Sequence, residues 1–187
     1  DGVPATPLAP SEVLFARDAL RIAIATERSG REFYARAARL TKEGPARRIF
    51  QRLAGDEVEH LRKLEDRYHA LLGAWPGLES QPTFLFFKGA AEGLFASGTA
   101  ELSAGIDEGQ ALLIGIRCER GSHNFFKKYG DQFEDSEGKQ IFLDFADEER
   151  EHLELLEREH KALVKRQAGK RPSSPRPRAT GRSAGSR

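Results

Sequence analysis

The stretches Glu57-Val-Glu-His60 and Glu149-Arg-Glu-His152 are two copies of Glu-x-x-His that begin 92 residues apart. Glu27 and Glu119 are separated by the same interval, and each precedes its Glu-x-x-His glutamate by 30 residues. Positions i and i+3 of a helix share a face, so each motif directs a carboxylate and an imidazole toward one point. Helical bundles build two-metal sites from two such motifs and one glutamate from each of two other helices. The spacing therefore predicts a dinuclear metal site.

The residues around these motifs repeat at the same offset. Residues 14–72 align with residues 106–164 without a gap, and the matched pairs include Leu20/Leu112, Ile24/Ile116, Phe33/Phe125, Phe50/Phe142, Ala54/Ala146, Leu61/Leu153 and Leu64/Leu156. Self-similarity at one fixed offset indicates a duplicated structural unit. We interpret the unit as a helical hairpin that occurs twice.

Periodic apolar positions predict four long helices, over residues 11–41, 45–72, 107–130 and 135–167, with a long crossover at 74–105. A further short helix within the crossover, around 87–103, is compatible with the pattern. The four glutamates lie 14 to 16 residues from the turns near 43 and 134. Because a helix rises about 1.5 Å per residue, antiparallel partners bring all six ligands to one layer of the bundle. The expected fold is an all-α four-helix bundle.

The six predicted ligands interrupt apolar faces of these helices. Buried carboxylates are unfavourable by several kcal/mol each unless they are paired. Four glutamates and two neutral histidines would balance two divalent cations, so the charge balance favours metal. The alternative is a bundle that contains buried ion pairs and no metal.

Length and composition restrict the protein class. A chain of 187 residues can form one domain with a substantial core. The single Cys118 excludes an internal disulfide and a four-cysteine metal centre, and a reducing cytoplasmic location is the expectation. No apolar run approaches the roughly 20 residues of a membrane span. We expect an N-terminal leader or linker at 1–10, a helical domain at 11–167 and a tail at 168–187.

The tail is strongly basic. Residues 160–187 hold nine Lys and Arg and no acid, whereas residues 1–159 carry a net charge of −8. The segment is rich in proline and poor in apolar residues, so we expect it to be disordered. Contact with nucleic acid is conceivable for such a tail, but it lacks interleaved aromatic residues, and a solvated tail is favoured.

With these motifs, residues 11–165 resemble the rubrerythrin branch of the ferritin-like superfamily. The resemblance implies a ferritin-like bundle with a di-iron centre that reacts with hydrogen peroxide or dioxygen in its diferrous state. By this likeness Glu57 and Glu149 would bridge the metals. Glu27 and Glu119 would be terminal ligands, and His60 and His152 would each cap one metal.

The chain departs from this family in two respects. Rubrerythrins carry a rubredoxin-like domain with four cysteines, which this sequence lacks, so an external electron donor protein is expected. They also carry an extra glutamate one turn after the third-helix ligand, where this chain has Ser122. That glutamate is associated with peroxide chemistry, and its absence puts a peroxidase activity in question.

Three further residues lie near the predicted ligands. Tyr34 lies on the same face as Glu27 and is either a core residue or a hydrogen-bond donor and electron relay beside the centre. His123 lies one turn beyond Glu119 and could approach a metal. Cys118 points about 100° away from its neighbour Glu119, so a buried thiol is favoured over a ligand.

The leading functional hypothesis is an oxidoreductase whose two iron ions consume peroxide or oxygen. The alternatives are an iron-storage or ferroxidase component, a manganese catalase-like enzyme, and a structural bundle with an incidental metal. Carboxylate and imidazole ligands do not separate iron from manganese well. A homo-oligomer, a dimer or larger, is also expected.

Overall fold

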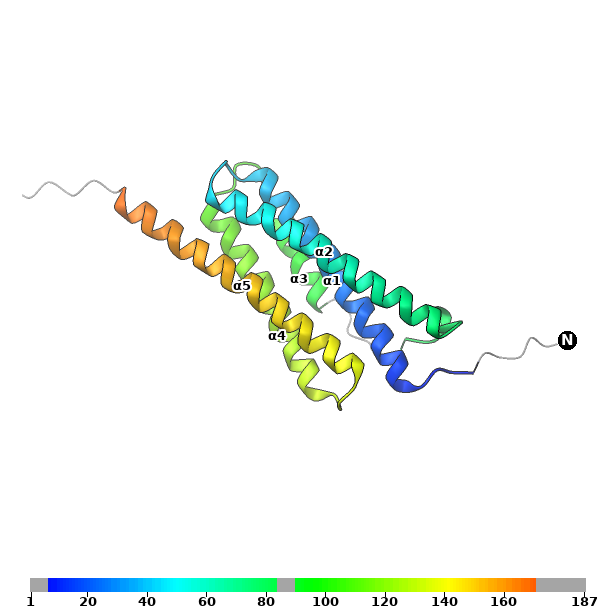
Figure 1. Cartoon of the computed structure of the whole chain (residues 1–187). Helices are drawn as coiled ribbons and strands as arrows, with labels where there is room; N and C mark the ends of the chain where they lie inside the picture. Colours follow the sequence, from blue (N-terminus) through cyan, green and yellow to red (C-terminus); the bar gives the residue numbers. More distant parts are fainter. Residues whose placement is uncertain (1–6, 84–89, 171–187) are drawn as a thin grey trace, which may run out of the picture.

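The computed structural model describes residues 7–83 and 90–170, and this part of the chain is helical without a strand. Five α-helices follow one another along the chain (Figure 1). Their bounds are α1 Ser11–Leu40, α2 Pro45–Ala74, α3 Ala90–Glu101, α4 Glu108–Gln132 and α5 Glu137–Gly169, and a single 3-10 turn, Leu78–Ser80, follows α2. The predicted all-α class with bundle-like packing is confirmed.

Local sequence signals account for several of the helix starts. Pro45 occupies the first turn of α2, where its missing N–H removes no helical hydrogen bond. The side chains of Asp107 and Ser136 accept hydrogen bonds from the backbone N–H groups of Gln110 and Lys139 at the starts of α4 and α5. The long helices end within two residues of the predicted bounds.

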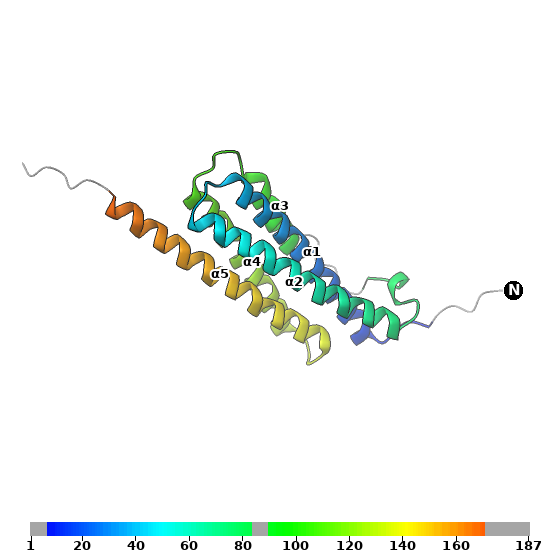
Figure 2. The ribbon, with the colours of Figure 1, turned by 45° about the horizontal axis from the view of Figure 1, so that its top comes forward.

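The helices pack as two neighbouring pairs. α1 lies along α2, and α4 lies along α5, while α3 packs against both α1 and α4 (Figures 1 and 2). Equivalent ion pairs join the helices of each pair: Arg28 contacts Glu65 at 2.7 Å, and Arg120 contacts Glu157 at 2.8 Å. These four residues correspond at the 92-residue offset. The origin of the two pairs as repeated hairpins stays a prediction.

The two larger apolar clusters of the interior leave one polar layer between them. The first contains Phe33, Phe50, Leu53, Phe95, Leu112 and Leu156, and the second contains Phe15, Leu20, Leu61, Phe126, Phe142 and Phe145, with further residues in each. Each long helix passes from one cluster to the other at its predicted metal-ligand glutamate. The predicted ligands therefore lie in a single layer, as the distances from the turns require.

A buried arginine fixes the start of the crossover, which the sequence did not indicate. Arg17 of α1 is fully buried and donates hydrogen bonds to the carbonyl oxygens of Leu78, Gln81 and Pro82. Its guanidinium also pairs with buried Asp18 at 2.9 Å. A buried cation with these acceptors holds residues 78–82 against α1.

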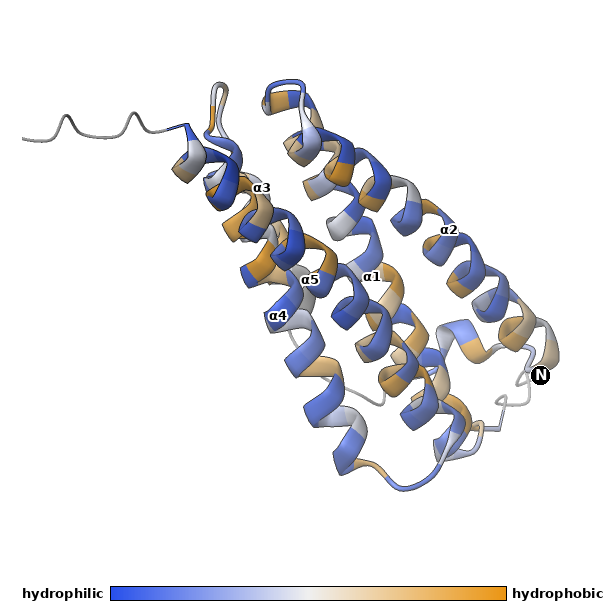
Figure 3. Ribbon diagram, turned by 60° about the vertical axis from the view of Figure 1, so that its left-hand side comes forward, coloured by the Kyte–Doolittle hydropathy of each residue, from blue (hydrophilic) through white to orange (hydrophobic). Residues whose placement is uncertain are grey.

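None of the described helices combines the length and apolarity that crossing a membrane requires. In Figure 3 hydrophobic and hydrophilic residues alternate along the long helices instead of forming one continuous apolar stretch. The predicted disordered tail, residues 168–187, lies outside the described residues except for 168–170. Helix α5 continues through the first two of these residues, to Gly169.

Candidate metal centre

The structure brings the six predicted ligands together from four helices. Glu27 lies on α1, Glu57 and His60 on α2, Glu119 on α4, and Glu149 and His152 on α5. Their donor atoms form two groups, within each of which the atoms lie no more than 4.8 Å apart. One group comprises Glu57, Glu119, Glu149 and His152, and the other comprises Glu27, Glu57 and His60.

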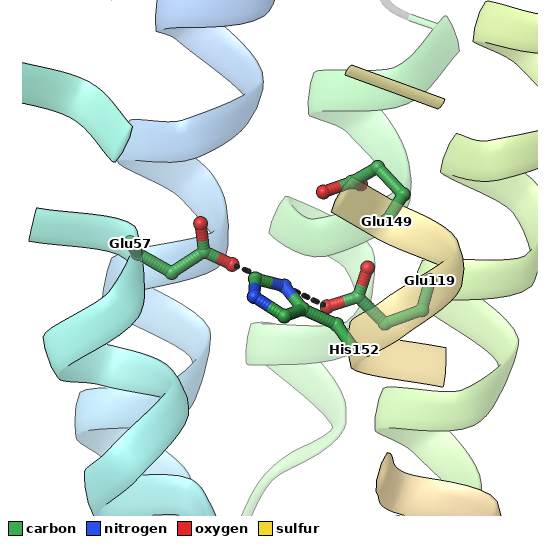
Figure 4. Close-up of side chains that lie close together, drawn as sticks. All are labelled: Glu57, Glu119, Glu149 and His152. Atoms are coloured by element: carbon green, nitrogen blue, oxygen red, sulfur yellow. Dashed lines mark ion pairs between the residues drawn. The ribbon is translucent and has the colours of Figure 1, made fainter. Parts of the chain in front are cut away.

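The first group surrounds His152. Its Nδ1 atom lies 3.4 Å from Glu119 Oε1 and 3.5 Å from Glu57 Oε1. Figure 4 shows the ring between these two carboxylates, with Glu149 on the same helix as His152. All four side chains are buried. Three carboxylates and one imidazole from three helices therefore converge on one small volume.

The second group is smaller and shares one residue with the first. His60 Nδ1 lies 3.4 Å from Glu27 Oε1, the counterpart of the His152–Glu119 distance in the other half. Glu57 contributes to both groups, whereas Glu149 contributes to only one. This geometry is compatible with the bridging position expected for Glu57. The imidazole rings of His60 and His152 stack with centroids 5.4 Å apart.

Burial and the neighbouring charges together set the pKa values of the centre. Burial raises the pKa of Glu57 to about 7, although the nearby His152 acts in the opposite direction. Burial, followed by the negative charges of Glu119 and Glu57, raises the pKa of Glu149 well above its usual range. Burial alone would lower the pKa of His152, but the Glu119 and Glu57 carboxylates outweigh it and raise this pKa to about 12. Without metal, the centre therefore retains protons that offset its negative charge.

The donor atoms fit divalent metal ions. Within the described chain, both carboxylate oxygens of Glu27 and the Oε2 atoms of Glu57, Glu119 and Glu149 are buried without a hydrogen-bond partner. Buried polar atoms in native proteins are nearly always satisfied, and unpaired buried carboxylates are strongly unfavourable. Divalent cations would satisfy these oxygens and replace the retained protons.

Tyr34 contacts a predicted ligand directly. It is fully buried on α1, and its hydroxyl donates a hydrogen bond to Glu119 Oε1. Burial and then the charge of Glu119 raise the pKa of this phenol well above its usual value, so the phenol keeps its proton. Phe126 occupies the equivalent position in the second half and has no hydroxyl. Of the two roles considered for Tyr34, the hydrogen-bond donor is the one that the contact supports.

Two of the other candidates lie outside the ligand groups. His123 Nδ1 donates to the carbonyl oxygen of Ala146 at 2.6 Å, which fixes the ring away from the centre. Cys118 is a buried free thiol whose sulfur contacts the Leu94 carbonyl oxygen at 3.3 Å. Burial raises the pKa of this thiol to about 12, so it remains protonated.

Position 30 in the first half and position 122 in the second differ in chemistry beside the centre. Ser122 is fully buried, and its hydroxyl moderates the rise in the pKa of Glu149. Its counterpart at the 92-residue offset is Gly30, where an added Cβ would lie 3.0 Å from Glu57 Oε1. Glu57 thus packs so closely against this position that even a methyl group there would press on its carboxylate.

Glu148 is a functional candidate that the sequence reasoning missed. Its Oε2 atom lies 3.6 Å from His60 Nδ1, although it precedes the Glu-x-x-His motif and is outside the repeated ligand pattern. The i, i+3 spacing used to find ligands does not include its position. Glu148 lies on the side of α5 that faces α2, and this position becomes apparent only when the packing of the two helices is known.

Comparison with known families gives a match to part of the chain. The Rubrerythrin family model matches residues 110–179, little more than a third of the chain, a range that includes most of α4 and all of α5. The match is consistent with the rubrerythrin-like, ferritin-like di-iron superfamily and confirms the resemblance that the motifs predicted. Searches of curated proteins and of solved structures found no match.

Proposed function

We propose that this protein is a di-iron oxidoreductase that oxidises bound ferrous iron with hydrogen peroxide or dioxygen. The observation that carries the proposal is the pair of buried donor groups that share Glu57. The family match supports a ferritin-like protein of the di-iron type. The oxidoreductase activity and the choice of oxidant are the further steps that we propose.

Each predicted ligand would have a distinct role in holding the metal ions. Glu57, which belongs to both donor groups, would hold both metal ions. The family resemblance assigns the same role to Glu149, while Glu27 and Glu119 would each hold one ion. Each imidazole would supply one nitrogen ligand. Tyr34 would hold the Glu119 carboxylate in place through its hydrogen bond, and the two apolar clusters would keep bulk water out of the layer.

Iron held by these residues would supply the electrons: reduction of one hydrogen peroxide to two water molecules takes two protons and two electrons, and each ferrous ion would provide one electron. The retained protons of the metal-free centre are released when metal binds. An external electron donor protein would return the ferric centre to the ferrous state. Manganese at the same ligands would support catalase-like chemistry instead.

Iron handling is the second candidate function. A cavity of about 170 Å³ borders His60 and reaches the protein surface. Such an opening favours a ferroxidase that takes up ferrous ions and passes ferric ions on. The two functions differ in whether iron remains bound after oxidation.

Metal analysis tests the proposal. The purified protein should bind about two iron ions per chain, as two-motif bundles do. Glu57→Gln should lose most of this iron because both donor groups include Glu57. Glu59→Gln is the matched control, because Glu59 lies on the same helix with its side chain 62% exposed.

Three further results would decide between the alternatives. Equal iron binding by the wild type and Glu57→Gln would overturn the proposed centre. Iron that stays bound through repeated peroxide additions with a reductant supports the oxidoreductase. Iron that leaves after one oxidation supports the ferroxidase.

A further inference from the structure

We propose that Glu148 is an entry ligand that captures divalent cations at the mouth of the cavity between α2 and α5 and transfers them to His60. This inference rests on the proposed metal centre and adds the route by which metal reaches it. It assigns a role to a residue outside the six predicted ligands.

The cavity beside His60 provides the opening. Its lining comes from α2, through His60, Lys63, Leu64 and Arg67, and from α5, through Ile141, Asp144, Phe145 and Glu148. The predicted ligand His60 lines this cavity and also belongs to one of the two donor groups. Metal that enters here meets an imidazole nitrogen before any buried carboxylate.

Three neighbouring side chains lead from the cavity to the buried centre, and their exposure to solvent falls from each one to the next. Glu148 Oε2 lies 3.6 Å from His60 Nδ1, and the same nitrogen lies 3.4 Å from Glu27 Oε1. The side chains are 40%, 18% and 0% exposed in this order. Both oxygens of Glu27 lack a hydrogen-bond partner within the described residues. A cation held between Glu148 and His60 is therefore one short step from a buried, unsatisfied carboxylate.

The charges at the opening leave Glu148 available. Asp144 precedes it by one helical turn and accepts a hydrogen bond from Gln140 at 2.6 Å. The cavity also contains Arg67, which lies 3.5 Å from Glu137, and the exposed Lys63. Among the described residues, His60 is the one basic side chain within 4 Å of the Glu148 carboxylate.

On the His152 side of the centre, the described residues form no equivalent arrangement. The counterpart of Glu148 at the 92-residue offset is Asp56, which is one methylene shorter and lies 3.8 Å from Arg52 of its own helix. The counterpart of His60 is His152, whose side chain is only 6% exposed. Among the described residues, His60 is therefore the more exposed of the two predicted histidine ligands, and it lines a cavity on one side of this nearly symmetric centre.

Carboxylate and imidazole together select divalent transition-metal ions. A single carboxylate at a partly exposed opening contributes mainly to the rate at which a cation is captured, and this contribution weakens with ionic strength. Loss of the Glu148 charge should therefore slow uptake without removing the final site.

Cobalt(II) uptake by the metal-free full-length chain provides the test, with visible absorbance followed after stopped-flow mixing. Glu148→Gln should slow uptake by about 3- to 10-fold at low salt, and the difference should narrow as salt increases. The final cobalt content and spectrum should match the wild type. Asp56→Asn, the matched control at the equivalent position, should take up cobalt at the wild-type rate.

Each other outcome overturns a specific claim. If Glu148→Gln takes up cobalt as fast as the wild type and Asp56→Asn do, Glu148 is not an entry ligand. If Glu148→Gln binds less cobalt at equilibrium, Glu148 is a permanent ligand and the entry role is wrong. If the wild type itself binds no cobalt and no iron, the metal centre fails, and this inference fails with it.

Discussion

Replacing Gly30 with alanine should stabilise the metal-free protein and weaken its binding of metal. Gly30 lies inside α1, where alanine favours the helix over glycine by about 0.8–1 kcal/mol. The added Cβ would lie 3.0 Å from Glu57 Oε1 and 3.4 Å from Glu57 Cδ. In the metal-free protein the Glu57 carboxylate can shift by a few tenths of an ångström and relieve this contact.

A metal-loaded centre does not allow the same shift. Glu57 belongs to both donor groups, so displacing its carboxylate disturbs the proposed ligands of both ions. We expect metal affinity to fall about tenfold or more, which corresponds to about 1.4 kcal/mol. The melting temperature of the metal-free protein should rise by about 2–4 °C, the shift expected for about 1 kcal/mol in a domain of this size.

Thermal melting of the metal-free protein and a competition titration with ferrous ion or cobalt(II) would measure the two effects. Gly55→Ala is the matched control, because Gly55 lies inside α2 and an added Cβ there meets no atom within 4 Å. The control should gain similar stability and keep wild-type affinity. The reasoning is refuted if Gly30→Ala binds metal as tightly as Gly55→Ala does.

Three further experiments would test the Tyr34–Glu119 hydrogen bond, the raised pKa values of Glu57 and His152, and the choice of oxidant. Tyr34→Phe removes the hydrogen bond to Glu119. Because a hydrogen bond to a charged group contributes about 1.5–3 kcal/mol, the metal-free variant should melt several degrees below the wild type. An unchanged melting curve would contradict the role of Tyr34 in holding Glu119. The pKa values of Glu57 and His152 are both raised in the folded protein, to about 7 and about 12. Their protons therefore stabilise the folded protein fully at a pH below the unfolded pKa values, and this stabilisation is lost as the pH rises through the folded pKa values. Urea unfolding of metal-free protein at pH 5 and pH 8 should therefore show lower stability at pH 8, with a smaller decrease after metal is added; a higher stability at pH 8 would argue against the raised pKa values. Since Ser122 supplies no fifth carboxylate as a seventh ligand, stopped-flow mixing of diferrous protein should show oxidation by both hydrogen peroxide and dioxygen. A preference for peroxide by orders of magnitude would show that this carboxylate is not needed.

Local signals in the chain were enough to predict the long helices and the layer in which the predicted ligands meet. Apolar periodicity and the breaks near 43 and 134 are local signals, and the constant rise of a helix converts them into depth along the bundle. Glu27, Glu57, Glu119 and Glu149 could therefore be assigned to one level from their distances to the turns.

The side chains that touch across that layer became apparent from the packing of the helices in the tertiary structure. This packing gave Tyr34 its partner Glu119, 85 residues away, and it brought Glu148 to His60 across the cavity between α2 and α5. It also placed Gly30 against the Glu57 carboxylate. Helical spacing fixes the face on which a residue lies, but the rotation and separation of packed helices, together with side-chain rotamers, determine which atoms meet. For this reason the six repeated positions, and the face on which Tyr34 lies, could be predicted from the sequence, whereas the contacts of Tyr34 with Glu119 and of Glu148 with His60 could not.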